Sequence, residues 1–315
     1  MESDNVVRAE LKTDTLRVTV LPELGGKIAS LIAVRAGTDV ELLQQPLAAY
    51  GPRDLTMGFE ESDASGFDEC LPSVAACMVK TAAGEVGVPD HGDFWRLPCV
   101  WQQEDGKLTL AASGASLPLF FERELTVEGS TLTIGYRLRN DGSEPVPYGW
   151  SAHPLFSVDA GDRIVIPGRE IAFQVEGSAG NRLGARGARH SWPLAKLNGG
   201  AEADLSIAGA IGDGIGDKIY LEAPKEGWAA IERKQSGLRL TVKFDPAESP
   251  WLGMWICYGG WPESGTVRQQ CVAIEPCTAP MDSLAEAAGQ GWARTLQPGA
   301  ESRWTMQITV GDVIG

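Results

Sequence analysis

The chain of 315 residues carries 42 acidic and 27 basic side chains, which gives a formal net charge of −15 with histidine counted as neutral. This balance argues against nucleic acid and against anionic membrane surfaces as partners, since binding to either depends on clustered positive charge. With 38 glycines, 19 prolines and 10 tryptophans, the composition is that of a turn-rich globular protein long enough to bury a substantial core.

Residues 1–5 are acidic and lack the apolar segment of a secretory signal. No run of about 18 apolar residues is present that could span a bilayer. The cysteines form no C-x-x-C pair and show no zinc-like spacing. The six are Cys70, Cys77, Cys99, Cys257, Cys271 and Cys277. We therefore expect reduced thiols and a cytoplasmic location.

Alternating apolar and polar residues predict strands along most of the chain. Residues 16–21 and 27–32 flank a turn that contains proline and two glycines, which favours an opening β-hairpin. Residues 46–69 lose this alternation, so we expect a long functional loop there. The pattern predicts further strands at residues 107–112, 119–127, 131–140, 163–167, 170–175, 218–222, 228–233, 238–244 and 302–310.

Two segments interrupt this strand pattern. Residues 176–217 are rich in glycine and arginine and are expected to form a long connection, with His190 as a solvated loop residue. Residues 281–289 carry a helical pattern between a capping Asp or Ser and a terminal glycine. Since no internal repeat and no linker is found, we predict one all-β domain over residues 1–315. It would be an antiparallel sandwich with very little helix.

One histidine, His153, lies between two strand-like runs in the aromatic segment 147–156. Because the unperturbed pKa of histidine is close to neutral pH, His153 is a candidate for proton transfer. The alternative is a core histidine, flanked by Trp150 and Phe156, whose ring nitrogens bond to the backbone. This segment alone favours the core interpretation.

Two further residues are suited to chemistry. His91 shares the spacing H-x-x-F with His153, and a glycine or proline after each histidine argues against a helix. The alternative for His91 is a loop residue held by Asp90 or Asp93. Glu275 follows an apolar strand and precedes a proline, and a buried glutamate without a partner is costly, which favours a functional role.

One glutamate and two histidines could bind a metal ion or act as a general base and a general acid. A nucleophilic triad is less favoured, because the chain has no G-x-S-x-G elbow. Residues 209–216 are glycine-rich but lack the G-K-[ST] of a phosphate-binding loop.

Taken in order, three motifs resemble the aldose 1-epimerase (galactose mutarotase) family. They are His91–Gly92 followed by an aromatic residue, the tyrosine-to-H-P-x-F segment at 148–156, and the strand ending in Glu275–Pro276. The similarity extends to an opening hairpin and two closing segments at residues 21–28, 282–285 and 296–299. It covers nearly the whole chain and implies a large antiparallel β-supersandwich, the class that the strand pattern also predicts.

The resemblance implies an enzyme that interconverts the α and β anomers of a free monosaccharide without a cofactor, and we expect no metal. By matching position, Glu275 would be the base at the C1 hydroxyl, His153 the acid at the ring oxygen, and His91 a residue that polarises the ring-oxygen side. A carboxylate and a protonated imidazole can carry out both proton transfers. The alternatives are a non-catalytic carbohydrate-binding or sensor protein, and another carbohydrate isomerase or lyase on the same scaffold.

The chain departs from the family pattern at residues 65–72, where the family carries a sugar-binding arginine. Asp68 and Glu69 are candidates to bind hydroxyl groups there, with a solvated acidic loop as the alternative. Asp217 is the nearest match to a later substrate-binding aspartate of the family. Lys218 beside it could contact an anionic substituent, so the sugar itself stays open.

Two tryptophans are weaker candidates for contact with a sugar. Trp95, close to His91, could form an apolar wall against a sugar face, and Trp255 lies in a strand-like segment rich in aromatic residues. Most of the tryptophans are expected in the core, because so many large rings cannot all contact a ligand.

Overall fold

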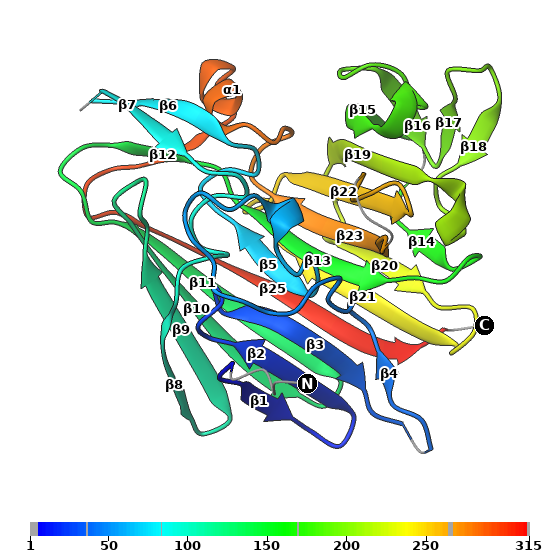
Figure 1. The fold of residues 1–315 in the computed structure, drawn as a ribbon, viewed down its shortest axis with the longest axis horizontal. Helices are drawn as coiled ribbons and strands as arrows, with labels where there is room; N and C mark the ends of the chain where they lie inside the picture. Colours follow the sequence, from blue (N-terminus) through cyan, green and yellow to red (C-terminus); the bar gives the residue numbers. More distant parts are fainter. Residues whose placement is uncertain (1–5, 36, 83, 169, 264–266, 314–315) are drawn as a thin grey trace.

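Two large antiparallel sheets form the body of the protein, in a computed structural model that describes residues 6–35, 37–82, 84–168, 170–263 and 267–313. The first sheet has eleven strands in the order β1-β2-β3-β5-β13-β23-β22-β19-β15-β16, with β4 paired to β3 (Figure 1). The second has eight, in the order β14-β20-β21-β25-β11-β10-β9-β8. The prediction of an all-β antiparallel sandwich with very little helix is confirmed.

The strands of the first sheet are β1 (Ala9–Lys12), β2 (Leu16–Leu21), β3 (Lys27–Ala33), β4 (Val40–Glu41), β5 (Phe67–Cys70), β13 (Ser151–Ser157), β15 (Ile171–Ser178), β16 (Arg189–Trp192), β19 (Ile215–Glu222), β22 (Trp251–Tyr258) and β23 (Gln270–Cys277). Those of the second sheet are β8 (Val100–Glu104), β9 (Lys107–Ser113), β10 (Leu119–Glu128), β11 (Thr131–Asn140), β14 (Arg163–Val165), β20 (Trp228–Glu232), β21 (Leu238–Phe244) and β25 (Glu301–Asp312).

Smaller elements surround these sheets. Three two-stranded sheets pair β6 (Cys77–Thr81) with β7 (Gly84–Val88), β12 (Val146–Tyr148) with β24 (Arg294–Leu296), and β17 (Leu194–Lys196) with β18 (Glu202–Asp204). The helical elements are α1 (Leu284–Gly289) and three 3-10 turns, η1 (Phe59–Glu61), η2 (Ala179–Asn181) and η3 (Ile211–Asp213). No helix among the described residues is long and apolar enough to cross a membrane.

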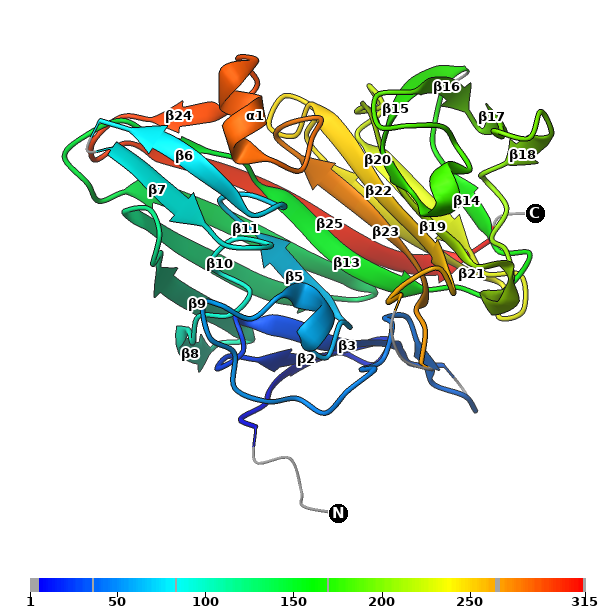
Figure 2. The same ribbon diagram turned by 45° about the horizontal axis from the view of Figure 1, so that its top comes forward.

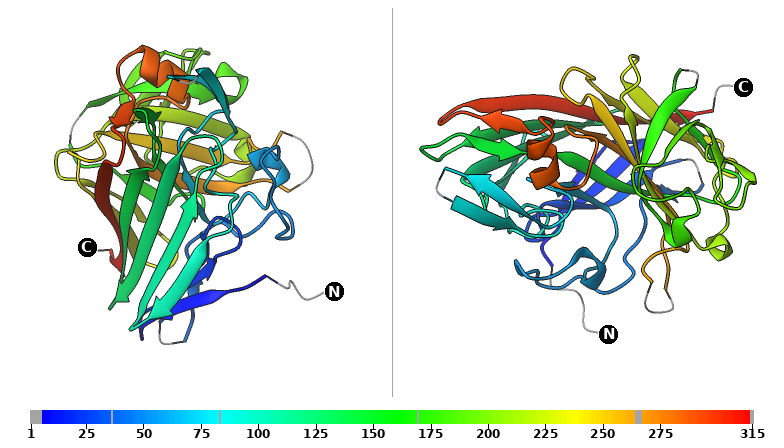
Figure 3. Two further views of the ribbon diagram at one scale, coloured as in Figure 1. Left: turned by 90° about the vertical axis from the view of Figure 1, so that its left-hand side faces the viewer. Right: turned by 90° about the horizontal axis from the view of Figure 1, so that it is seen from above.

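The core between the sheets follows from the period-two pattern of the strands. Along β11 the side chains alternate between buried and half-buried positions, as expected for a strand with one face toward a core. The buried cluster includes Leu31 of β3 and Ile274 of β23 from the first sheet together with Leu132 of β11 from the second. Figure 3 shows the sandwich from two further sides, with β1 close to β9 and β10 at one end.

Two expected loops contain regular structure. The segment 46–69 is irregular except for η1, but it ends in β5, whose four residues are all buried. The segment 176–217, expected to be a long connection, contains the short strands β16, β17 and β18, so that expectation was wrong in part. These strands have only three or four residues, too few for a period of two to be recognised.

His190 lies in β16 and is half-buried, so the expectation of a solvated loop residue was also wrong. Its Nε2 is 2.8 Å from the carbonyl oxygen of Leu183, and its ring centroid lies 5.3 Å from that of Phe173. The helix expected at 281–289 is present as α1, and Ser283 caps it by accepting a hydrogen bond from the Glu286 amide. Residues 1–5, where no signal segment is predicted, lie outside the described residues.

The β6–β7 hairpin, α1 and η1 lie on the same side of the first sheet. In Figure 2 α1 lies next to β6, and the short coil of η1 lies close to β5. Phe59 of η1, His91 after β7 and Asp282 before α1 line the cavity of the candidate site.

Candidate active site

The strand register brings several chemically active side chains to one face of the first sheet. Ser151 of β13 lies opposite Cys277 of β23. Residues two apart on a strand share a face, so His153 and Glu275 point to the same side. The registers of β22 with β23 and of β19 with β22 place Lys218 on this face as well. Three residues far apart in the sequence thus meet because their strands are neighbours.

A cavity of about 160 Å³ lies over this face. Four of the predicted site residues line it, His91, His153, Lys218 and Trp255. The full lining is Phe59, Val74, His91, His153, Lys218, Trp255, Trp261, Gln269 and Asp282. The mixture of aromatic walls with a few converging polar groups is typical of a small-molecule site.

Glu275 is fully buried beneath the cavity. Its Oε2 accepts hydrogen bonds from Lys218 Nζ and, at 3.3 Å, from Ser151 Oγ. Its Oε1 has no hydrogen-bond partner among the described residues and lies 3.9 Å from His153 Nε2. Burial raises the pKa of Glu275, while the Lys218 ammonium opposes this rise. One carboxylate oxygen is therefore held by a cation and the other is free to accept a proton.

His153 is buried, and its Nδ1 has no hydrogen-bond partner in the described part of the chain. A purely structural core histidine would have its ring nitrogens satisfied, so this geometry does not support the core interpretation. Burial, followed by the charges of His91 and Lys218, lowers the pKa of His153 well below its ordinary value. Without a bound substrate, the imidazole of His153 is therefore neutral at neutral pH.

His91 is held in the left-handed region with φ of 56°, and Gly92 follows with φ of 72°. A Cβ atom on Gly92 would lie 2.0 Å from the Leu71 carbonyl oxygen, so no side chain fits at this position. The His91 ring stacks on Phe59 at 4.3 Å and 13°, and it lies 5.2 Å from the His153 ring. The H-G motif is thus a tight turn that aims the imidazole into the cavity.

Asp90 joins this turn to the loop that carries Phe59. One of its oxygens, Oδ2, accepts a hydrogen bond of 2.9 Å from the Phe59 amide. The other, Oδ1, lies 3.0 Å from His91 Nδ1, although the ring nitrogen is not aligned for a hydrogen bond. The aspartate therefore holds the loop of Phe59 by a hydrogen bond and lies beside the His91 ring that stacks on Phe59.

Several wall residues were not among the sequence candidates. Asp282 accepts a hydrogen bond of 2.6 Å from the Tyr220 hydroxyl, and Gln269 Oε1 accepts one of 2.9 Å from Trp255 Nε1. Phe59 lies in an aperiodic loop, where nothing in the pattern singles it out. Asp282 begins the segment with the helical pattern, and an acidic residue before a helix is normally interpreted as a cap.

Asp68 lies on the same face as His153 but belongs to a buried charge cluster beside the cavity. It pairs with Lys27 and with Arg53, and Asp63 binds the same two cations. Asp68 and Asp63 are 2% and 3% exposed, and neither lines the cavity. Asp68 is thus not a solvated loop residue, and its placement does not support contact with a sugar hydroxyl.

Glu69 points to the opposite face, because neighbours on a strand alternate. There it accepts hydrogen bonds from Arg123 (3.1 Å), Tyr136 (3.0 Å) and Trp150 (2.9 Å), between the two sheets. Burial raises the pKa of Glu69 to about 7, while these three donors favour the carboxylate. Glu69 joins the sheets and lies away from the cavity.

Asp217 and Trp95 also lie outside the cavity wall. Asp217 is fully buried on the face opposite Lys218 and binds Arg182 and Ser178. Trp95 is fully buried, donates a hydrogen bond of 3.0 Å to the Asp90 carbonyl and has the guanidinium of Arg96 over its ring. Both positions suit structural support, and neither supports the predicted contact with a substrate.

No protein-family model and no curated protein matches the chain. Solved structures do match it. Slr1438 from Synechocystis sp. PCC 6803 aligns with a TM-score of 0.71 at 16% identity, over 99% of this chain and 98% of that chain. A provisionally assigned aldose 1-epimerase from Escherichia coli K12 aligns with a TM-score of 0.71 at 17% identity, over 98% of this chain and 100% of that chain. A galactose mutarotase-like protein from Lactobacillus casei aligns with a TM-score of 0.69 at 14% identity, over 97% of this chain and 100% of that chain. The chain therefore has the galactose mutarotase-like β-sandwich fold, as the sequence resemblance predicted.

Proposed function

We propose that the protein is an aldose 1-epimerase-like isomerase that interconverts the α and β anomers of a free monosaccharide without a cofactor. The observation that carries this proposal is the free Oε1 of Glu275, buried below the cavity and 3.9 Å from His153 Nε2. Leaving a buried acceptor unpaired costs on the order of 1–3 kcal/mol. The atom is best explained as the acceptor of a substrate proton.

In this mechanism Glu275 Oε1 takes the proton from the C1 hydroxyl, and the bond between C1 and the ring oxygen breaks. His153 supplies a proton to the ring oxygen, which gives the open-chain aldehyde. Rotation about C1–C2 and the reverse transfers give the other anomer. The two reacting oxygens are bonded to the same carbon, so an acid and a base 3.9 Å apart suit both transfers.

The environment of His153 bears on its role as the acid. Since its pKa lies well below the ordinary value, the imidazolium is a strong proton donor but a minor species at neutral pH. The neighbouring carboxylate of Glu275 stabilises that cation when it forms. We assign to His91, which stacks on Phe59, the role of polarising the same side of the sugar.

The experiment is anomer exchange followed by NMR or polarimetry on a panel of neutral, acidic and phosphorylated aldoses. We expect acceleration for at least one sugar and a loss of about 10²- to 10⁴-fold in the Glu275→Gln variant. Glu85→Gln, the same change at an exposed position of β7, is the matched control. No acceleration for any sugar, or full activity in Glu275→Gln, contradicts the mechanism. Sugar binding without exchange would instead favour a carbohydrate-binding protein.

A further inference from the structure

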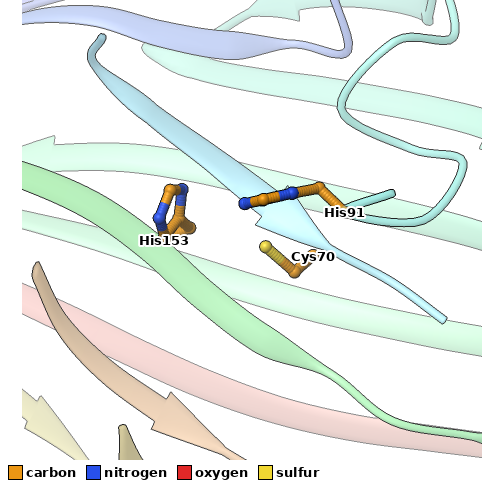
Figure 4. Close-up of side chains that lie close together, drawn as sticks. All are labelled: Cys70, His91 and His153. Carbon is orange, nitrogen blue, oxygen red and sulfur yellow. The ribbon is translucent and has the colours of Figure 1, made fainter. Parts of the chain in front are cut away.

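A sulfur donor lies close to the two histidines of the cavity. Cys70 of β5 lies opposite Ser151 of β13, two residues from His153, so the thiol and the imidazole share a face. His91 approaches from the turn after β7. One donor atom from each of Cys70, His91 and His153 lies within 4.8 Å of the others, and Figure 4 shows the sulfur below and between the two rings.

The outer nitrogen of each ring has a carboxylate near it. His91 Nδ1 lies 3.0 Å from Asp90 Oδ1, and His153 Nε2 lies 3.9 Å from Glu275 Oε1. This leaves Nε2 of His91 and Nδ1 of His153 available to bind a ligand next to the Cys70 sulfur. In metal sites a carboxylate that accepts a hydrogen bond from the far ring nitrogen orients the histidine and increases its basicity. Among the described residues both carboxylates lie near those nitrogens without such a hydrogen bond, so binding of the cation would require each pair to align.

We propose that Cys70, His91 and His153 form a binding site for a thiophilic divalent cation of the zinc type. One thiolate and two imidazoles are borderline-soft donors that suit Zn²⁺ and disfavour Mg²⁺ and Ca²⁺. Bonds of about 2.0–2.3 Å in a tetrahedral site place the ligand atoms about 3.5 Å apart. The three donors therefore have to close by about an ångström, and the fourth position faces the cavity.

Binding has a defined proton balance. Cys70 is buried as a free thiol, so coordination of the cation forms a sulfur–metal bond and releases the thiol proton to the buffer. The sequence expectation of no metal followed from the family resemblance and from the lack of zinc-like cysteine spacing. This donor set, from β5, the turn after β7 and β13, is non-local, and no local spacing reveals it.

The site has a consequence that rests on the proposed function. A cation bound to Nδ1 of His153 takes the lone pair that carries a proton in the imidazolium, so His153 can no longer be protonated and act as the acid through Nε2. The cation would therefore block proton transfer to the sugar. Micromolar Zn²⁺ should abolish anomer exchange in the parent protein and leave exchange in a Cys70→Ser variant much less affected.

The decisive experiment does not depend on a sugar. The metal-free full chain is titrated with Co²⁺, and the thiolate-to-cobalt charge-transfer absorption is recorded, with calorimetry in two buffers to count released protons. We expect one Co²⁺ and about one proton per chain, and displacement by Zn²⁺. Cys70→Ser should lose the absorption and more than about 100-fold in affinity, since loss of an outer-shell partner alone typically costs 10–100-fold.

Two further variants keep this test interpretable. Cys271→Ser, the same change at another buried cysteine of the first sheet, should retain both the absorption and the affinity. If Cys70→Ser fails to fold, His91→Asn decides, because asparagine readily adopts the left-handed backbone at that position. A parent protein without thiolate absorption, or a Cys70→Ser or His91→Asn variant that binds as tightly as the parent, overturns the proposal.

Discussion

Lys27 is a charged side chain without solvent exposure, and its replacement by methionine tests the buried charge cluster beside the cavity. Its ammonium lies 3.1 Å from Asp63, forms an ion pair with Asp68 and donates to the Ser65 carbonyl. The methionine fills a similar volume without the charge. Two buried carboxylates would then share Arg53 alone.

The expected loss of stability in Lys27→Met follows from the pKa of the Asp63 carboxyl. Burial alone would raise the pKa of Asp63, but Lys27 and Arg53 outweigh burial and lower it from 3.8 to about 2. That shift corresponds to about 2.5 kcal/mol of stability at neutral pH. Breaking a buried ion pair from one side costs about 3–5 kcal/mol. For a chain of 315 residues this loss lowers the melting temperature by about 5–8 °C.

The pH dependence has a defined sign. A lowered pKa in the folded state gives stability that is present above pH 3.8 and is lost as the pH falls toward 2. The parent protein loses this contribution in acid, whereas Lys27→Met lacks most of it at every pH. The difference in free energy of unfolding between the parent and Lys27→Met should therefore become smaller as the pH falls from about 5 toward 2.

Urea denaturation and calorimetry at several pH values measure both effects. Lys12→Met, the same change in a pair whose lysine is 71% exposed, should stay within about 0.5 kcal/mol of the parent. A Lys27→Met protein that melts within about 1 °C of the parent at pH 7, or a difference that stays constant down to pH 2, would refute the reasoning.

Two glycine substitutions test the geometry of the site. In Gly253→Ala the new Cβ would lie 2.9 Å from Glu275 Oε2, so the rate of anomer exchange should fall by at least about tenfold. Circular dichroism should show that the fold persists. An unchanged rate would contradict the assignment of Glu275 as the base. In Gly92→Ala the Cβ would lie 2.0 Å from the Leu71 carbonyl oxygen, so denaturation should show a loss of about 3 kcal/mol or more. Gly106→Ala, with φ of 76° and no atom within 4 Å of the new Cβ, should lose only about 1 kcal/mol; an equal loss in both would show that crowding is not the cause.

The sequence predicted the fold better than the details of the site. Long strands such as β11 and β21 were expected within a residue of their ends, because alternation over seven or more residues is a strong signal. Glu275 was singled out because a buried glutamate in an apolar strand needs a partner. His91 and His153 became site candidates mainly because their motifs, with Glu275, follow the order of a known family, since the segment of His153 alone favoured a core residue.

The failures concern information that a local pattern does not contain. Asp68 and Glu69 were treated as a pair, yet adjacent residues on a strand point to opposite faces, and which face borders the cavity depends on β13. Phe59 completes the site through a stacking contact across 32 positions of the chain, from a loop without periodicity. Contacts of this kind depend on sheet order, which the strand pattern alone does not specify.

The Glu69–Arg123 ion pair makes evolutionary changes at one position of each sheet depend on each other. It joins positions 54 residues apart, one on each sheet, and both side chains are at most 2% exposed. A mutation that removes either charge leaves the other buried without its ion-pair partner, so we expect single changes to be selected against and paired changes to be tolerated. Among relatives of this chain, the two positions should therefore vary together, as glutamate with arginine or as two uncharged residues.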